Sequence, residues 1–176
     1  MEFDIDYIEE DGNLSIREKR NQSGNSYTVG WNTNTKYEVE LGLPYGVSIE
    51  IIGEDDNYTI TNINGSITIK TEDGDIEISD CDPNSLNITL EDGDIQLMKV
   101  NTKFDIRLED GNIRAENCNF GNSTLIVVDG DIKFIETSLG TTKIRNEDGN
   151  IALAVKCDSK TQVKIETEDG DVKLKT

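Results

Sequence analysis

The carboxylates of the Asp-Gly turns are the side chains of this sequence whose type and spacing best suit ion binding or catalysis. The segment Glu72-Asp73-Gly74-Asp75 recurs as Glu91-Asp92-Gly93-Asp94. If such turns stack about 4.8 Å apart, as neighbouring strands do, their carboxylates repel one another. A calcium ion, which prefers carboxylate and carbonyl oxygens, would relieve that repulsion. The candidate calcium ligands are Asp73, Asp75, Asp92, Asp94, Asp129 and Asp131.

A structural interpretation of the same turns competes with calcium binding, and we prefer it. Asp-Gly favours tight turns because Gly adopts positive φ without steric cost and Asp hydrogen-bonds to the local backbone. Asn112 and Asn150 stand where other turns carry Asp, and the Gly-Gly-x-Gly-x-Asp nonapeptide of calcium-binding β-rolls is absent from the sequence. We therefore expect no cofactor and no resident metal, with calcium as the alternative.

Catalysis is not expected from this composition. The sequence contains no His, which excludes histidine triads, histidine metal sites and histidine general bases. Carboxylate pairs are abundant, but they recur in near-identical surroundings, whereas a catalytic pair needs two unlike environments. We predict that the chain has no catalytic residues and is not an enzyme.

The turn glycines recur at a nearly fixed period, with separations of 19, 18, 19, 19 and 21 residues. These glycines are Gly74, Gly93, Gly111, Gly130, Gly149 and Gly170. Aliphatic residues stand five positions before them, at Ile69, Ile88, Ile106, Leu125, Ile144 and Ile165. Others stand two positions after them, at Ile76, Ile95, Ile113, Ile132, Ile151 and Val172. A third set lies four positions after them, at Ile78, Leu97, Ala115, Phe134, Leu153 and Leu174. Each unit therefore reads as strand, turn and strand, with alternate side chains facing inward.

This pattern predicts an all-β fold in a single domain of residues 1–176. Stacked units would form a β-solenoid resembling a parallel β-helix, whereas an antiparallel meander would use each Asp-Gly as a hairpin turn. The near-constant period favours the solenoid, because stacking requires it and hairpins do not. Gly12 and Gly65 carry similar offsets and are interpreted as partial units.

The N-terminal part of the chain departs from the period. We expect an N-terminal cap with irregular strands over residues 1–58 and regular repeats over residues 59–176. Residues 17–46 break the repeat, and all five tyrosines and Trp31 precede residue 59. A cap of this kind would cover the open edge of the first coil.

The three cysteines test the stacking arrangement. Cys81 and Cys118 each lie seven residues after their turn glycine, which places them in one column two coils apart. Two coils span about 9.6 Å, beyond the Cα separation that a disulfide tolerates. Cys157 lies about two coils further on. We therefore predict three unpaired cysteines in the interior, which suits a reducing compartment.

The charge of the chain restricts its partners. The 36 acidic residues and 17 basic residues give a formal charge of −19, which repels nucleic acids and anionic membranes. The acidic N-terminus and the lack of long apolar runs predict neither an export signal nor a membrane-spanning helix in this chain. A protein or a cell-surface polymer is the expected partner, without nucleic acid and without direct membrane insertion.

Two segments upstream of the regular units carry a resemblance to a known family. Leu43-Pro44-Tyr45-Gly46-Val47-Ser48-Ile49 is followed by Ile63-Asn64-Gly65-Ser66-Ile67-Thr68-Ile69 and then by the Glu-Asp-Gly-Asp-Ile units. Together they resemble the bacterial β-strand-repeat proteins called putative adhesins or toastrack domains. The resemblance implies a β-solenoid-like fold, a setting at the bacterial envelope and no established catalytic residues. The leading functional hypothesis is an interaction or adhesion scaffold.

Overall fold

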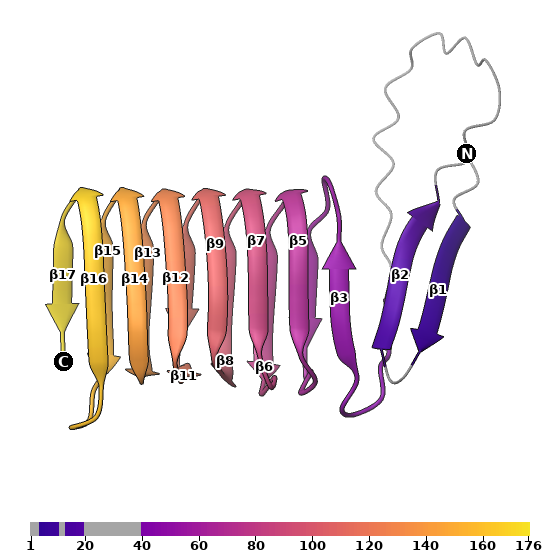
Figure 1. Ribbon diagram of the computed structural model, residues 1–176, viewed down its shortest axis with the longest axis horizontal. Helices are drawn as coiled ribbons and strands as arrows, with labels where there is room; N and C mark the ends of the chain where they lie inside the picture. Colours follow the sequence, from indigo (N-terminus) through magenta and orange to yellow (C-terminus); the bar gives the residue numbers. More distant parts are fainter. Residues whose placement is uncertain (1–3, 11–12, 20–39) are drawn as a thin grey trace, which may run out of the picture.

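The computed structural model describes residues 4–10, 13–19 and 40–176, which form two facing β-sheets in a long stack (Figure 1). In order across the first sheet, the strands are β1 (Asp4–Glu10), β2 (Asn13–Lys19), β3 (Ser48–Ile52), β5 (Ile67–Asp73), β7 (Leu86–Asp92), β9 (Phe104–Asp110), β12 (Ser123–Asp129), β14 (Thr141–Asp148) and β16 (Gln162–Asp169). The second sheet contains β4 (Tyr58–Thr61), β6 (Ile76–Cys81), β8 (Ile95–Thr102), β10 (Ile113–Glu116), β13 (Ile132–Leu139), β15 (Ile151–Lys156) and β17 (Val172–Lys175), with the short β11 (Asn119–Phe120) beside β8 and β13. No helix occurs in the described ranges.

The chain coils through the two sheets alternately, and equivalent residues of successive coils pair in parallel. Ile88 lies opposite Ile69 on one side and opposite Ile106 on the other. The β-solenoid prediction is therefore confirmed, and the antiparallel meander is wrong. The antiparallel pairing of β1 with β2 is the exception among the described strands.

The core is a stack of inward-facing aliphatic side chains between the two sheets. The residues five before, two after and four after each turn glycine are 0–2% exposed in the inner coils. Phe120 also packs edge-on between Phe104 and Phe134, with ring centroids 4.7 Å and 5.8 Å away. These columns confirm the inward positions that the repeat predicts.

The turn of the first coil is not at Gly65, so the interpretation of Gly65 as a partial unit is wrong. Gly65 lies between β4 and β5, whereas the turn between β3 and β4 contains Asp55-Asp56-Asn57. Asp55 forms a parallel bridge with Asp73, and Gly74 lies against the carbonyl of Asp56. Asp56 therefore takes the place that glycine holds in later coils. Gly12 lies outside the described residues.

A second periodic bend lies in the second sheet. Five non-glycine residues there adopt positive φ between 48° and 59°, and they are Asn62, Asp80, Lys99, Asn117 and Glu136. In the coils of Asp80, Lys99, Asn117 and Glu136 the next residue points inward and is buried; two of these buried residues are Cys81 and Cys118. The coil of β15 lacks the extra residue, because Ile135 pairs with Ala154 but Thr137 pairs with Val155.

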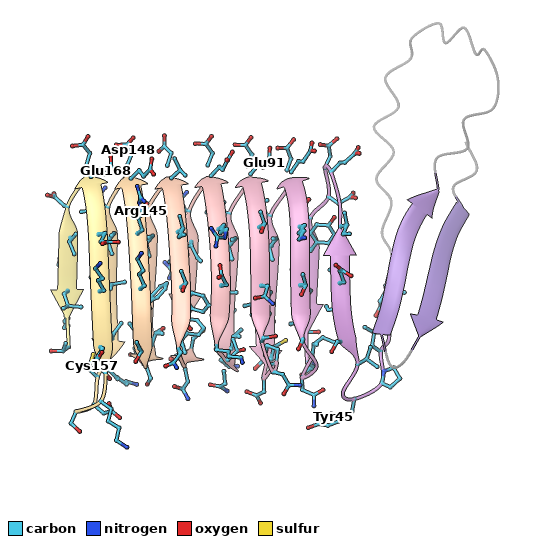
Figure 2. The ribbon with its side chains drawn as sticks, viewed as in Figure 1. Tyr45, Glu91, Arg145, Asp148, Cys157 and Glu168 are labelled. Atoms are coloured by element: carbon cyan, nitrogen blue, oxygen red, sulfur yellow. The ribbon has the colours of Figure 1, made fainter. Side chains whose placement is uncertain are left out.

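The missing residue explains why one cysteine prediction fails. All three cysteines are unpaired, as expected, and Cys81 and Cys118 are buried. Val155 fills the interior position of the β15 coil, so Cys157 falls in the loop after β15 and is exposed (Figure 2). Cys157 is therefore not an interior residue.

The expected N-terminal cap is described only in part. Residues 20–39, which include Trp31, lie outside the described residues. Tyr58 packs against the core, whereas Tyr45 is 92% exposed. In the described ranges no helix is long and apolar enough to cross a membrane.

Candidate interaction edge

The Asp-Gly turns line up along one edge of the solenoid because each glycine lies directly against the turn of the preceding coil. Gly111 has φ of +136° and Gly130 has φ of +145°, a backbone conformation that residues with a Cβ rarely adopt. A Cβ added to Gly130 would lie 2.7 Å from the carbonyl carbon of Gly111 and nearer still to its oxygen. The N–H of Gly111 donates to Asp129 O at 2.9 Å, and that of Gly130 donates to Asp148 O at 2.9 Å.

The residue after each glycine forms a second ladder through its side chain. The N–H of Asp94 donates to Oδ1 of Asp75 at 2.9 Å, and the N–H of Asn112 donates to Oδ1 of Asp94 at 2.8 Å. The same contact continues through Asp131 and Asn150. Asp and Asn both supply the accepting oxygen, which explains why the two residue types alternate at this position.

The calcium candidates fall into two columns of this edge. Asp73, Asp92 and Asp129 pair along the strand ends, and Asp75, Asp94 and Asp131 belong to the side-chain ladder. In the ladder one carboxylate oxygen of each already accepts a backbone N–H, which supports the structural role of the turns. Within residues 40–176 no group of three or more acidic or cysteine side chains is placed to hold a metal ion.

Carboxylates dominate the whole edge, which we call the acidic edge. It carries half of the 36 acidic residues of the chain: Glu54, Asp55, Asp56, Glu72, Asp73, Asp75, Glu91, Asp92, Asp94, Glu109, Asp110, Asp129, Asp131, Glu147, Asp148, Glu168, Asp169 and Asp171. Figure 2 shows Glu91, Asp148 and Glu168 along it. No Lys or Arg occupies a position in these turns.

Repulsion and partial neutralisation both occur along the acidic edge. Desolvation raises the pKa of Asp73, and the neighbouring carboxyls of Asp55 and Asp92 raise it further. Arg145, on the outer face of β14, reaches the edge and contacts Glu147 at 3.1 Å and Glu168 at 3.2 Å. Arg145 thus neutralises part of the charge of the edge.

Sequence reasoning missed the turn of the first coil because that turn has no glycine. A signal was present, since Asp56 precedes Gly74 by 18 residues and has aliphatic Ile51 five residues before it. Asn57 extends the side-chain ladder by one coil, because its Oδ1 accepts the N–H of Asp75 at 2.7 Å.

Two ladders of turn contacts, an aliphatic interior and an outer surface of exposed polar columns define a β-solenoid repeat scaffold. The family model described as Toastrack DUF4097 matches residues 3–176, and the chain therefore belongs to the Toastrack family of unknown function. No curated protein and no solved structure matches the chain. The toastrack part of the expected resemblance is confirmed, whereas adhesion and the envelope setting stay predictions.

Proposed function

We propose that this chain is a non-catalytic interaction scaffold that binds a basic segment of a partner protein along its acidic edge. The observation that carries the proposal is the segregation of charge. All 13 Lys and Arg residues between 40 and 176 lie outside the turns that hold half of the acidic residues. The edge thus presents carboxylates at the spacing of neighbouring strands, about 4.8 Å. Such a field attracts cationic partners and repels anionic ones.

The flat faces offer a weaker attraction, because they carry both signs of charge and several of their acids are neutralised locally. Arg107 lies 3.6 Å from Asp105, and Arg114 contacts Glu116. Exposed ion pairs of this kind contribute little to stability, but they remove net charge from the face. A cationic segment therefore gains most by lying along the acidic edge.

The test is binding of a dye-labelled oligolysine peptide to two variants of equal net charge. One variant carries Glu72→Gln, Glu91→Gln and Glu109→Gln on the edge. The control carries Glu50→Gln, Glu77→Gln and Glu136→Gln, all exposed and off the edge. At about 0.2–1 kcal/mol per lost charge contact, the edge variant should bind roughly 3- to 100-fold more weakly than the wild type. Equal weakening of both variants would show that net charge alone attracts the peptide and would refute the proposal.

A second candidate function is a calcium-stabilised binding module. It is favoured by the crowding of Asp73 between Asp55 and Asp92, which raises its pKa. A divalent cation would relieve this crowding. Thermal unfolding in EDTA is compared with unfolding in millimolar calcium or magnesium at matched ionic strength. A large stabilisation by calcium alone supports the module, and equal melting temperatures exclude it.

An adhesion role at the bacterial envelope rests on the family resemblance alone. In this version the scaffold contacts a cell-surface polymer in place of a protein. Fractionation of the native cell followed by immunodetection tests the setting. Recovery of the protein with the envelope supports it, and recovery in the cytosolic fraction contradicts it.

A further inference from the structure

A shallow hollow lies on the outer face of the first sheet, in the middle of the stack. It spans β5, β7 and β9, which lie side by side (Figure 1), and its volume is about 200 Å³. Further coils flank these strands, with β3 beside β5 and β12 beside β9. Six outward side chains line the hollow in two rows across the paired strands: Thr68, Asn87 and Asp105 in one row, and Lys70, Thr89 and Arg107 in the other.

The side chains of the hollow have hydrogen-bonding capacity that the described protein does not use. Thr68, Asn87 and Thr89 make no side-chain hydrogen bond to the described residues, and Lys70 has no ion-pair partner among them. Arg107 uses its Nε for an ion pair within the hollow, at 3.6 Å, which leaves its two Nη groups without a partner in the described chain. These groups are available to a ligand.

The mixture of donors and acceptors indicates the chemistry of that ligand. Lysine and arginine side chains only donate, an ionised carboxylate only accepts, and hydroxyl and amide groups do both. An anion needs donors alone and a cation needs acceptors alone, whereas each hydroxyl group of a sugar both donates and accepts. The hollow combines all three kinds of group on neighbouring strands, so it matches a polyhydroxylated ligand.

The charge around the hollow disfavours acidic ligands. Glu72, Glu91 and Glu109 of the acidic edge lie two residues beyond the hollow on the same three strands. Together with the formal charge of −19, these carboxylates repel an anion that approaches the face. A neutral sugar meets no such repulsion.

A peptide fits the hollow less well than a sugar does. The backbone of β7 is paired with β5 on one side and with β9 on the other, so no strand can add to it. The hollow also lacks an exposed apolar side chain to anchor a peptide, because Ile69 and Ile88 beneath it are 0% and 2% exposed. The attraction that this face offers is therefore hydrogen bonding by side chains.

The polar surface continues along the same face, which suits a chain of sugar units. Asp105 pairs with Thr124 of β12, and Thr124 pairs with Lys143 of β14. A second hollow lies over β12, β14 and β16, and its lining includes Asn122 and Thr141. Equivalent side chains recur at the strand spacing of about 4.8 Å, close to the length of one pyranose unit in an extended sugar chain.

We propose that the outer face of β5, β7 and β9 binds a neutral oligosaccharide, which lies across the strands in an extended conformation. Sugar hydroxyls donate to Asp105 and accept from Lys70 and Arg107, and Asn87 and the two threonines bind further hydroxyls. Each contact is exposed and weak, so affinity grows with the number of sugar units. The site is separate from the acidic edge and does not rest on the proposed function.

Nuclear magnetic resonance of the nitrogen-15-labelled full chain tests the proposal. The ligands are neutral hexasaccharides in β-1,4 linkage, built from glucose, mannose, galactose or N-acetylglucosamine. At least one of them should shift the amide signals of residues 68–70, 87–89 and 105–107 and leave the signals of the second sheet unchanged. A hexamer of galacturonate should bind more weakly at low salt, because the acidic chain repels it.

Matched double variants locate the binding in the hollow without a change of charge. Asn87→Ala with Thr89→Val should weaken sugar binding about fivefold or more, since two hydrogen-bonding groups are lost. Gln96→Ala with Thr59→Val makes similar changes at exposed positions of β8 and β4, and it should leave sugar binding unchanged. Urea denaturation of each variant confirms that the fold is retained.

The two proposed sites can be refuted separately. The Glu-to-Gln variant of the acidic edge should bind the hexasaccharide as the wild type does. The double variant of the hollow should bind oligolysine as the wild type does.

Three outcomes overturn the proposal. The first is that none of the neutral hexasaccharides shifts the amides of the hollow. The second is equal weakening of sugar binding by both double variants. The third is tighter binding of the galacturonate hexamer, or of a decapeptide of Ser, Thr and Asn, at the same amides, which would assign the hollow to an acidic ligand or to a peptide.

Discussion

An alanine at position 130 would place a methyl group against the backbone of the neighbouring coil. The new Cβ would lie 2.7 Å from the carbonyl carbon of Gly111, well inside the contact distance of about 3.5–4.0 Å between carbon atoms. The obstacle cannot rotate away, because the turn of Gly111 is held by the bond from its N–H to Asp129 O. The φ of +145° at position 130 would also become strained.

The expected loss of stability follows from these two effects. A non-glycine residue in a sparsely populated backbone region costs about 1–3 kcal/mol. Separating the two turns far enough to admit the methyl group breaks the two hydrogen bonds that join them, from Gly111 N–H to Asp129 O and from Asp131 N–H to Asn112 Oδ1, at about 1 kcal/mol each. Gly130→Ala should therefore lower the free energy of unfolding by about 3–5 kcal/mol, a large part of the total for a domain of this size.

Gly121→Ala is the matched control, because the same methyl group meets open space there. Its nearest neighbours would be Lys103 Cβ at 3.8 Å and Thr102 O at 3.9 Å, which are ordinary contacts, and its φ is not positive. This change should be neutral or should stabilise by up to about 1 kcal/mol. Both variants are compared by urea denaturation followed by circular dichroism. A loss below 1 kcal/mol for Gly130→Ala would refute the close stacking of the turns.

Three further predictions follow from buried or charged groups. Asn146→Val should lower the free energy of unfolding by about 1–3 kcal/mol in the same urea assay, because Nδ2 of the buried Asn146 donates to Gly130 O at 3.1 Å and to Asp148 O at 3.4 Å and Val removes both hydrogen bonds; an unchanged or higher stability would contradict this. Thiol titration of the native protein should show one fast cysteine, the exposed Cys157, because the other two are buried and burial raises their pKa; two or three fast thiols would disagree. The pKa of Asp73 is raised in the folded state, so its charge disfavours folding at neutral pH, and this cost is relieved only as the pH falls through the raised pKa towards the ordinary value of 3.8. Asp73→Asn, which removes the charge, should therefore raise the melting temperature at pH 7.5, and a lower melting temperature would contradict the sign.

The repeat made the architecture predictable from the sequence. Parallel stacking imposes a near-constant period, and the aliphatic residues at fixed offsets from each Asp-Gly turn therefore marked the interior columns correctly. The same logic failed where a coil departs from the consensus. The first turn contains Asp56 in place of glycine, and the backbone tolerates this because Asp56 is not among the residues with positive φ.

The position of Cys157 depends on a backbone detail that composition does not reveal. Most coils contain one extra residue that forms a bend with positive φ, and this residue is Asn, Asp, Lys or Glu. Only Asn and Asp favour that conformation, so Lys99 and Glu136 gave no local signal for the bend. Because the sequence does not show which coils contain this bend, counting residues from Gly149 could not show that Val155, and not Cys157, fills the interior.

The acidic edge was only partly predictable. Its carboxylates were identified as exposed turn residues, but the hydrogen bonds from Asn112 and Asn150 to the preceding Asp side chains depend on the stacking geometry. The exposure of Val172 and Leu174, 45% and 55%, was not anticipated, since both residues match the interior pattern as well as those of any other coil.

Because equivalent residues of adjacent coils pair with each other, the stack can lengthen or shorten only by whole coils. Each coil contacts its two neighbours alone along the stack, so an insertion or deletion of one whole unit changes the length by about 4.8 Å and leaves every other interface as it was. An insertion or deletion of part of a unit would instead place the turns out of register and interrupt the hydrogen bonds of both turn ladders. Genetic duplication of one repeat is thus a route by which the rod can grow in regular steps, with two carboxylates or more added to the acidic edge each time.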